Sequence, residues 1–148
     1  MLSVFSDEYF MKEALKEANK AFEEGEIPVG AVVVCKNRII ARAHNQTERL
    51  TDVTAHAEML ALTASSHNLG SKFLPDCDLF VTLEPCTMCA GAIFWSRIRR
   101  LIYAAPDPKR GFTLLSPNAL HPKTEVQSGI LAMESAQLLS FFFNKLRN

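Results

Sequence analysis

The amino-acid sequence predicts an α/β protein with three layers, in which helices cover both faces of a mixed central sheet of about five strands. Residues 31–35 are continuously apolar and rich in valine, which is typical of a strand buried deep in a sheet. Between residues 39 and 104, strand, helix and strand follow one another twice, and such units favour parallel pairing with helices on the sheet faces. The 148 residues, 48% of them hydrophobic, can form one domain, residues 1–148.

A helix and a β-hairpin are expected at the start of the chain. Ser6 is a candidate N-cap, and apolar residues at helical spacing follow it until Gly25, where the helix is expected to end. The sequence Lys36-Asn37-Arg38 indicates a tight turn between the strand at residues 31–35 and a second strand at residues 39–43. The first two strands are therefore predicted to pair in antiparallel fashion.

The middle of the chain contains the two strand and helix units. A polar loop at residues 46–53 leads to a helix that starts near His56 and ends before Gly70. The next elements are a strand, a helix and a strand, at residues 78–83, 85–96 and 101–104. The sheet is therefore expected to be antiparallel at the first hairpin and parallel beyond it.

The end of the chain begins with a predicted loop. Residues 106–122 contain four prolines, which do not continue helices or central strands. A short strand around residues 124–126 and a final helix at residues 131–145 complete the predicted fold.

Two cysteines at the start of the helix at residues 85–96 form half of a candidate metal site. Cys86 and Cys89 are three positions apart, so a helix that begins at Pro85 places both sulfur atoms on one face. The free N–H groups and the positive dipole end of that helix favour the thiolate, which is the form that binds metal. On their own, the two cysteines are also compatible with a redox pair or a closed structural zinc site.

His56 and Glu58 supply the other half of the candidate site. They stand at the start of the upstream helix, from which both side chains can reach a site lying off the helix end. One histidine and two cysteines leave the fourth position of a tetrahedral Zn²⁺ site to water, which makes such a site catalytic rather than structural. Glu58 is not needed as a ligand and is the natural proton carrier. H-x-E followed by P-C-x-x-C is a known signature of zinc nucleobase deaminases.

The remaining carboxylate and thiols have simpler interpretations. Glu84 is either a catalytic carboxylate or an acceptor for backbone N–H groups at a helix start. Cys35 and Cys77 lie in or beside apolar runs and are interpreted as buried core residues.

With two of the four cysteines at metal spacing and no secretory leader, a reducing cytoplasm is the expected location. No apolar stretch reaches about 18 uncharged residues, so no membrane span is expected.

The charge of the chain limits how it can bind nucleic acid. The formal net charge is zero, with 16 basic and 16 acidic residues, so a nucleic-acid partner must be held by a local patch. An ordinary solvated face is the alternative interpretation of the candidate basic residues, which are Arg97, Arg99, Arg100, Lys109, Arg110, Lys145 and Arg147.

Three motifs carry a resemblance to a known family. Residues 27–32, 54–58 and 83–92 read IPVGAV, TAHAE and LEPCTMCAGA, in the order and spacing of that family. The chain resembles the bacterial tRNA-specific adenosine deaminases, within the cytidine deaminase-like superfamily. The likeness covers most of the chain, with a departure at residues 110–126, where family members usually carry a longer loop near the substrate mouth.

The resemblance implies a reaction and further site residues. It implies hydrolytic deamination of adenosine to inosine at the wobble position of a tRNA anticodon loop, with the target base flipped into the zinc pocket. Asn45 would bond the base or the ribose, and Val29 and Ala57 would shape the base pocket. Lys109 would contact the phosphates of the tRNA. The resemblance also implies a homodimer that pairs through the helix at residues 90–95, which is unusually apolar.

Two other functions stay open at this point. The first is deamination of a free nucleobase or nucleoside such as guanine or cytosine, which the altered segment at residues 110–126 and the aromatic pair Phe94-Trp95 would suit. The second is a zinc-stabilised interaction module without catalysis. Such a module leaves Glu58 unexplained, so the sequence disfavours it.

Overall fold

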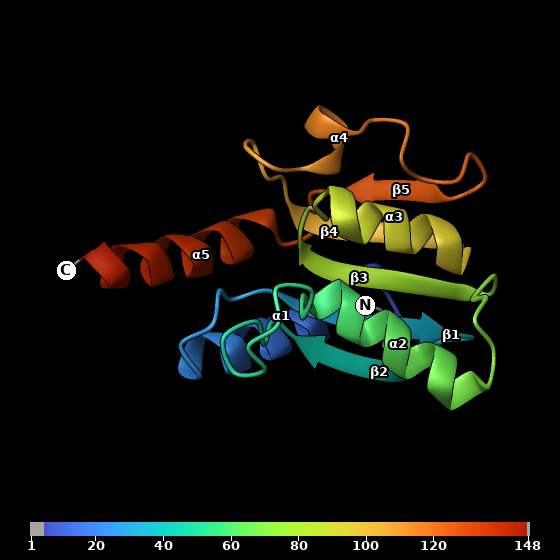
Figure 1. Ribbon diagram of the computed structural model, residues 1–148, viewed down its shortest axis with the longest axis horizontal. Helices are drawn as coiled ribbons and strands as arrows, with labels where there is room; N and C mark the ends of the chain where they lie inside the picture. Colours follow the sequence, from blue (N-terminus) through green and yellow to red (C-terminus); the bar gives the residue numbers. More distant parts are fainter. Residues whose placement is uncertain (1–4, 148) are drawn as a thin grey trace.

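A five-stranded sheet runs through the middle of the molecule, with the strand order β2-β1-β3-β4-β5 (Figure 1). The computed structural model describes residues 5–147. Helices lie on both faces of this sheet, so the predicted three-layer α/β/α class is confirmed. The strands are β1 (Gly30–Cys35), β2 (Arg38–His44), β3 (Cys77–Leu83), β4 (Arg100–Ala105) and β5 (Glu125–Ser128).

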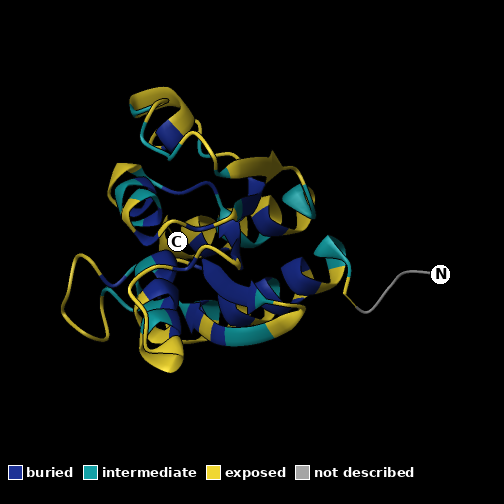
Figure 2. Ribbon diagram, turned by 90° about the vertical axis from the view of Figure 1, so that its right-hand side faces the viewer, coloured by how far each residue is buried: buried dark blue, intermediate teal, exposed yellow. Residues whose placement is uncertain are grey.

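The two faces of the sheet are covered by different helices. The helices are α1 (Asp7–Glu23), α2 (Ala57–Leu69), α3 (Thr87–Ser96), α4 (Phe112–Leu115) and α5 (Ala132–Arg147). Helices α2 and α3 pack over one face, where Val33 and Leu79 are fully buried. Helix α1 packs over the other face, where Val32 and Phe80 are fully buried, and α5 contacts α1 and β4. Figure 2 shows the buried residues concentrated between these layers.

The predicted first helix and hairpin are both present. The Ser6 hydroxyl accepts a hydrogen bond of 3.1 Å from the Tyr9 N–H and so caps α1. Lys36 and Asn37 have φ angles of 53° and 63°, the positive values that a two-residue hairpin turn requires. Strands β1 and β2 pair in antiparallel fashion, as the sequence predicts.

The predicted pairing of the middle strand is wrong. Strand β3 was expected to pair in parallel with the hairpin, but it pairs with β1 in antiparallel fashion. The reason is that β1 lies between β2 and β3, so the crossover through α2 skips one strand. Strands β2 and β3 still run in the same direction, and β3, β4 and β5 pair in parallel.

Smaller differences concern the ends of elements. Helix α3 begins at Thr87 rather than at Pro85, and Cys86 is its N-cap residue. The predicted loop at residues 106–122 contains the single turn α4, which the prolines on either side of it obscure in the sequence. Within residues 5–147, no helix is both long and apolar enough to cross a membrane.

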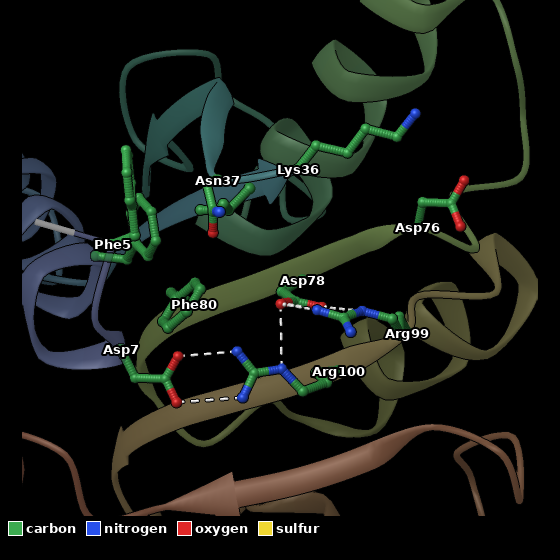
Figure 3. Close-up of a pocket in the computed structure, with 11 residues that line it drawn as sticks. Phe5, Asp7, Lys36, Asn37, Asp76, Asp78, Phe80, Arg99 and Arg100 are labelled. Carbon is green, nitrogen blue, oxygen red and sulfur yellow. Dashed lines mark hydrogen bonds and ion pairs between the residues drawn. The ribbon is translucent and has the colours of Figure 1, made fainter. Parts of the chain in front are cut away.

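Two of the candidate basic residues, Arg99 and Arg100, are paired with carboxylates. Arg100 donates to both oxygens of Asp7, at 2.8 and 3.1 Å, and to Asp78 at 3.1 Å, while Arg99 forms a two-bond pair with Asp78 (Figure 3). These ion pairs lie where β3 and β4 begin and join the start of α1 to the sheet. Arg99 and Arg100 are therefore bound to carboxylates at the end of the sheet opposite to Leu83.

Replacing Arg100 should destabilise the fold more than replacing its neighbour. Arg100→Met removes three charge-assisted hydrogen bonds from a largely buried group, and we expect the free energy of unfolding to fall by about 2 kcal/mol. Arg99→Met is the matched control, because the Arg99 side chain is 57% exposed and should contribute less than about 1 kcal/mol. Urea unfolding measures both values. Equal losses would show that the Arg100 network stabilises the fold no more than the exposed Arg99 pair does.

Candidate active site

The two predicted halves of the metal site meet at the ends of β2 and β3. His56 is the N-cap residue of α2, and Cys86 is the N-cap residue of α3. Cys89 lies in the first turn of α3 and is fully buried. Both helices pack on the same face of the sheet, so their first turns point ligand side chains at the same point.

The three side chains have the spacing of a metal site. The His56 Nδ1 atom is 3.7 Å from the Cys86 sulfur and 3.5 Å from the Cys89 sulfur, and the three ligand atoms all lie within 4.8 Å of one another. Tetrahedral zinc, with Zn–N near 2.0 Å and Zn–S near 2.3 Å, would hold nitrogen and sulfur about 3.5 Å apart. The donor set and its separations therefore fit a zinc ion.

The charges of these groups favour binding of a cation. A hydrogen bond from the Cys89 thiol, together with His56, lowers the pKa of the Cys86 thiol to about 4, whereas the pKa of Cys89 is raised by the same bond. The Cys86 thiolate in turn raises the pKa of His56. The free side chains thus share protons, which a metal ion would displace.

Glu58 lies beside this group without belonging to it. It is in the first turn of α2 and only 4% exposed. Burial raises the pKa of its carboxyl group, because the charged form loses its water. A carboxyl group with a raised pKa can both take up and release a proton nearer to neutral pH.

A small cavity of about 190 Å³ opens beside these residues. This volume is below the roughly 300 Å³ at which sites for larger ligands begin, and it suits a single flat ring system. The predicted residues that line it are Val29, Asn45, His56, Ala57, Glu58 and Cys86. Five further residues line it, which are Ile27, Leu83, Glu84, Asp107 and Arg110. The sequence named Glu84 and Arg110 as candidates for other roles, whereas it did not identify Ile27, Leu83 or Asp107 as site residues.

Asn45 has an unpaired acceptor in this cavity. Its Nδ2 donates weakly to the Ile27 carbonyl at 3.4 Å, and its backbone N–H bonds Val29. Its Oδ1 atom is buried and has no hydrogen-bond partner among residues 5–147. Buried acceptors are almost always satisfied, so this oxygen indicates a ligand that donates a hydrogen bond.

The structure decides between the two interpretations of Glu84. Its carboxylate accepts hydrogen bonds from the backbone N–H groups of Asp107 and Thr113, each at 3.0 Å, and from the Thr113 hydroxyl at 2.6 Å. A Cβ atom on Gly111 would lie 2.3 Å from the same carboxylate. Glu84 therefore binds backbone N–H groups, although these belong to the segment after β4 and not to its own helix.

Lys109 is exposed next to the cavity but does not line it. Its neighbour Arg110 does line it. The sequence could not show which of the two residues lines the cavity, because this depends on a turn held by hydrogen bonds to Asp107 and Glu84. The role of Lys109 in phosphate contact stays a prediction.

The three-layer fold, with a histidine, two cysteines and a glutamate around one small cavity, defines a zinc-dependent deaminase with the cytidine deaminase-like fold. Residues 5–105 match the family model of the cytidine and deoxycytidylate deaminase zinc-binding region, so the chain belongs to that family and Zn²⁺ is its cofactor. Within this family, the chain is one of the tRNA-specific adenosine deaminases, as its relatives show.

The relatives are similar over nearly the whole chain. The chain is 48% identical over 146 residues to the tRNA-specific adenosine deaminase of Aquifex aeolicus, covering 95% of this chain and 96% of the relative. It is 47% identical to the enzyme of the same name from Bacillus subtilis, covering 95% and 91%.

Solved structures show the same fold. A structure from a study of A-to-I editing by tRNA:A34 deaminases is 48% identical, with a TM-score of 0.82 over 88% of this chain and 98% of that chain. A guanine deaminase from Nitrosomonas europaea also has a TM-score of 0.82, but only 25% identity, over 93% of this chain and 84% of that chain. The identities favour the tRNA deaminases, whereas the fold is common to both.

Of the four cysteines, only the two at the start of α3 should determine the zinc content. We expect elemental analysis to find about one zinc per chain, because the three ligand atoms match one tetrahedral site. Cys86→Ser should lose most of this zinc, since a serine hydroxyl is a poor replacement for a thiolate. Cys35→Ser, at the other end of the sheet, is the matched control and should keep it. A Cys86→Ser protein with a full zinc content would contradict the site.

Proposed function

We propose that this protein deaminates adenosine to inosine at the wobble position of a tRNA anticodon loop. The observation that carries the proposal is the small cavity where His56, Cys86 and Glu58 meet the unpaired Asn45 oxygen, in a chain 48% identical to a tRNA-specific adenosine deaminase. The reaction consumes one water and releases one ammonia, which a zinc site with an open position can support. A tRNA substrate is consistent with the cytoplasm as the location.

His56, Cys86 and Cys89 are the proposed zinc ligands. When bound, zinc supplies Lewis acidity that lowers the pKa of water to about 7 and so makes it nucleophilic near neutral pH. The neutral imidazole and two thiolates balance the charge of Zn²⁺. The buried start of α3 holds both sulfur atoms in place, because Cys89 cannot move without disturbing the core.

Glu58 is the proposed catalytic proton carrier. Its buried carboxylate accepts the proton of the attacking water and passes it to the ring nitrogen next to the amino-bearing carbon. It then takes the second proton of the former water from the new hydroxyl group and gives it to the amino group, which leaves as ammonia. A raised pKa suits both steps, because the group must gain and lose a proton within one turnover.

The remaining lining residues are proposed to hold the base. The Asn45 oxygen would accept a hydrogen bond from the nucleoside, which would satisfy its missing partner. Val29 and Ala57 present apolar walls to the ring faces. The base must leave its stack to enter so narrow a cavity, which is easier in an anticodon loop than in a duplex.

Deamination of a free base is the second candidate function. The similarity to a guanine deaminase, with a TM-score of 0.82, favours it at the level of the fold. A substrate panel separates the two functions: tRNA with adenosine at the wobble position, adenosine, guanine and cytosine. We expect inosine in the tRNA and no ammonia from the free bases. Ammonia from guanine, with no inosine in tRNA, would replace the first function by the second.

Glu58→Gln should keep zinc and lose catalysis. The amide fills the same space but cannot shuttle a proton, so we expect the turnover rate on tRNA to fall by about a thousandfold or more. Glu23→Gln is the matched control, because Glu23 is an exposed glutamate at the end of α1, and its rate should not change. Turnover by Glu58→Gln close to that of the parent would assign proton transfer to another group.

A homodimer is also proposed, on the apolar surface around the ends of α2 and α3. Trp95 is 70% exposed and Phe73 is 43% exposed, beside a hollow of about 570 Å³ that Met59 and Ala92 also line. A tryptophan with this exposure, next to an apolar hollow, is typical of an interaction surface. A second copy of the chain would bury both aromatic rings at once.

Light scattering at micromolar concentration tests the dimer. We expect twice the chain mass of 16.5 kDa for the parent protein. Trp95→Glu should shift the protein to a monomer, because it places a charge in the proposed interface. Phe141→Glu, at a residue on α5 that is 68% exposed, is the matched control and should remain dimeric. A parent protein of single-chain mass would rule out the dimer.

A further inference from the structure

Arg110 is the cationic side chain at the mouth of the base cavity. It lines the cavity and is exposed to solvent. Four other arginines form ion pairs with carboxylates: Arg42 with Glu13, Arg49 with Glu24, and Arg99 and Arg100 with Asp78. Arg38, Arg97 and Arg147 form no such pair among the described residues, but they do not line this cavity. Among residues 5–147, no ion pair involves Arg110.

The backbone that carries Arg110 is held firmly. Its N–H donates to the Asp107 side chain at 3.0 Å, and the next N–H, of Gly111, donates to the Asp107 carbonyl at 3.0 Å. Asp107 is itself held by Glu84, and Phe112 donates to the Pro85 carbonyl at 2.9 Å. The segment is therefore fixed at both ends to residues next to Cys86.

The other charged residues around Arg110 are mostly acidic, but none of them forms an ion pair with its guanidinium. Glu58, Glu84 and Asp107 also line the cavity. The Glu84 carboxylate already accepts three hydrogen bonds, and the Asp107 carboxylate accepts hydrogen bonds from two backbone N–H groups. Glu58 is buried deeper inside. The planar guanidinium of Arg110 is thus exposed at the cavity and is in no ion pair among residues 5–147, so an anion at the mouth could bind two of its N–H donors at once.

We infer that Arg110 is a specificity-determining residue that binds a phosphate next to the target nucleoside. This inference rests on the proposed function and refines it. A base that fills a cavity of about 190 Å³ leaves its ribose at the mouth and its phosphodiester groups outside. The guanidinium stands at this mouth and can bond two phosphate oxygens. A free base or nucleoside has no phosphate there, so Arg110 favours a polynucleotide.

The test uses an anticodon stem-loop RNA made in two forms. One form has natural phosphates, and the other has neutral methylphosphonates on both sides of the target adenosine. With the natural RNA, Arg110→Gln should raise KM about tenfold and leave kcat within about twofold, because a contact to the bound ground state is lost. The salt dependence of binding should become shallower by roughly one unit of slope. With the neutral RNA, Arg110→Gln and the parent should have the same KM.

Two further variants control this experiment. Arg38→Gln removes an exposed arginine from the start of β2, at the far end of the sheet, and should change none of these values. Arg110→Lys should keep most of the salt slope but recover KM only in part, because an ammonium cannot form the paired contact.

An equal rise in KM on both RNAs, or no rise on either, would overturn the phosphate contact while leaving the deaminase function intact. A parent protein that forms no inosine in the natural RNA would overturn the proposed function, and the Arg110 contact with it.

Discussion

The meeting of two helix starts at one end of the sheet is the constraint on which the site depends. Because β1 lies between β2 and β3, these two strands run in the same direction, and the helices that follow them start at the same end. His56 and Cys86 are the N-cap residues of these helices, so residues 30 positions apart come within 3.7 Å. The positive ends of both helices also favour the thiolate that a cation needs.

A second layer of contacts turns this ligand group into a substrate site. Glu84 follows β3 directly and uses its buried carboxylate to hold the segment after β4 against the cavity. Gly111 is required there, because any Cβ atom would collide with that carboxylate. The segment after β4 is therefore anchored at its start by Glu84, and exposed side chains on it, such as Arg110, can change without disturbing the zinc ligands.

The sequence was sufficient to predict the strands, the four longer helices and the chemical groups of the site, because these depend on local patterns. The capping of α1 by Ser6, the turn at Lys36 and Asn37, and the grouping of His56 with the two cysteines all follow from spacing. The antiparallel pairing of β3 with β1 could not be predicted. A strand, helix and strand in sequence indicate that the two strands run in the same direction, but not whether a third strand lies between them in the sheet. Arg110 was not distinguished from Lys109, because its placement depends on long-range bonds to Glu84.

X-ray absorption at the zinc edge of the purified protein tests the central claim, an open site with three protein ligands, most directly. The account predicts two sulfur neighbours at about 2.3 Å and two lighter neighbours at about 2.0 to 2.1 Å, one of them the His56 nitrogen. A zinc ion with three or four sulfur neighbours would indicate a closed structural site. That result would contradict catalysis at the meeting point of α2 and α3.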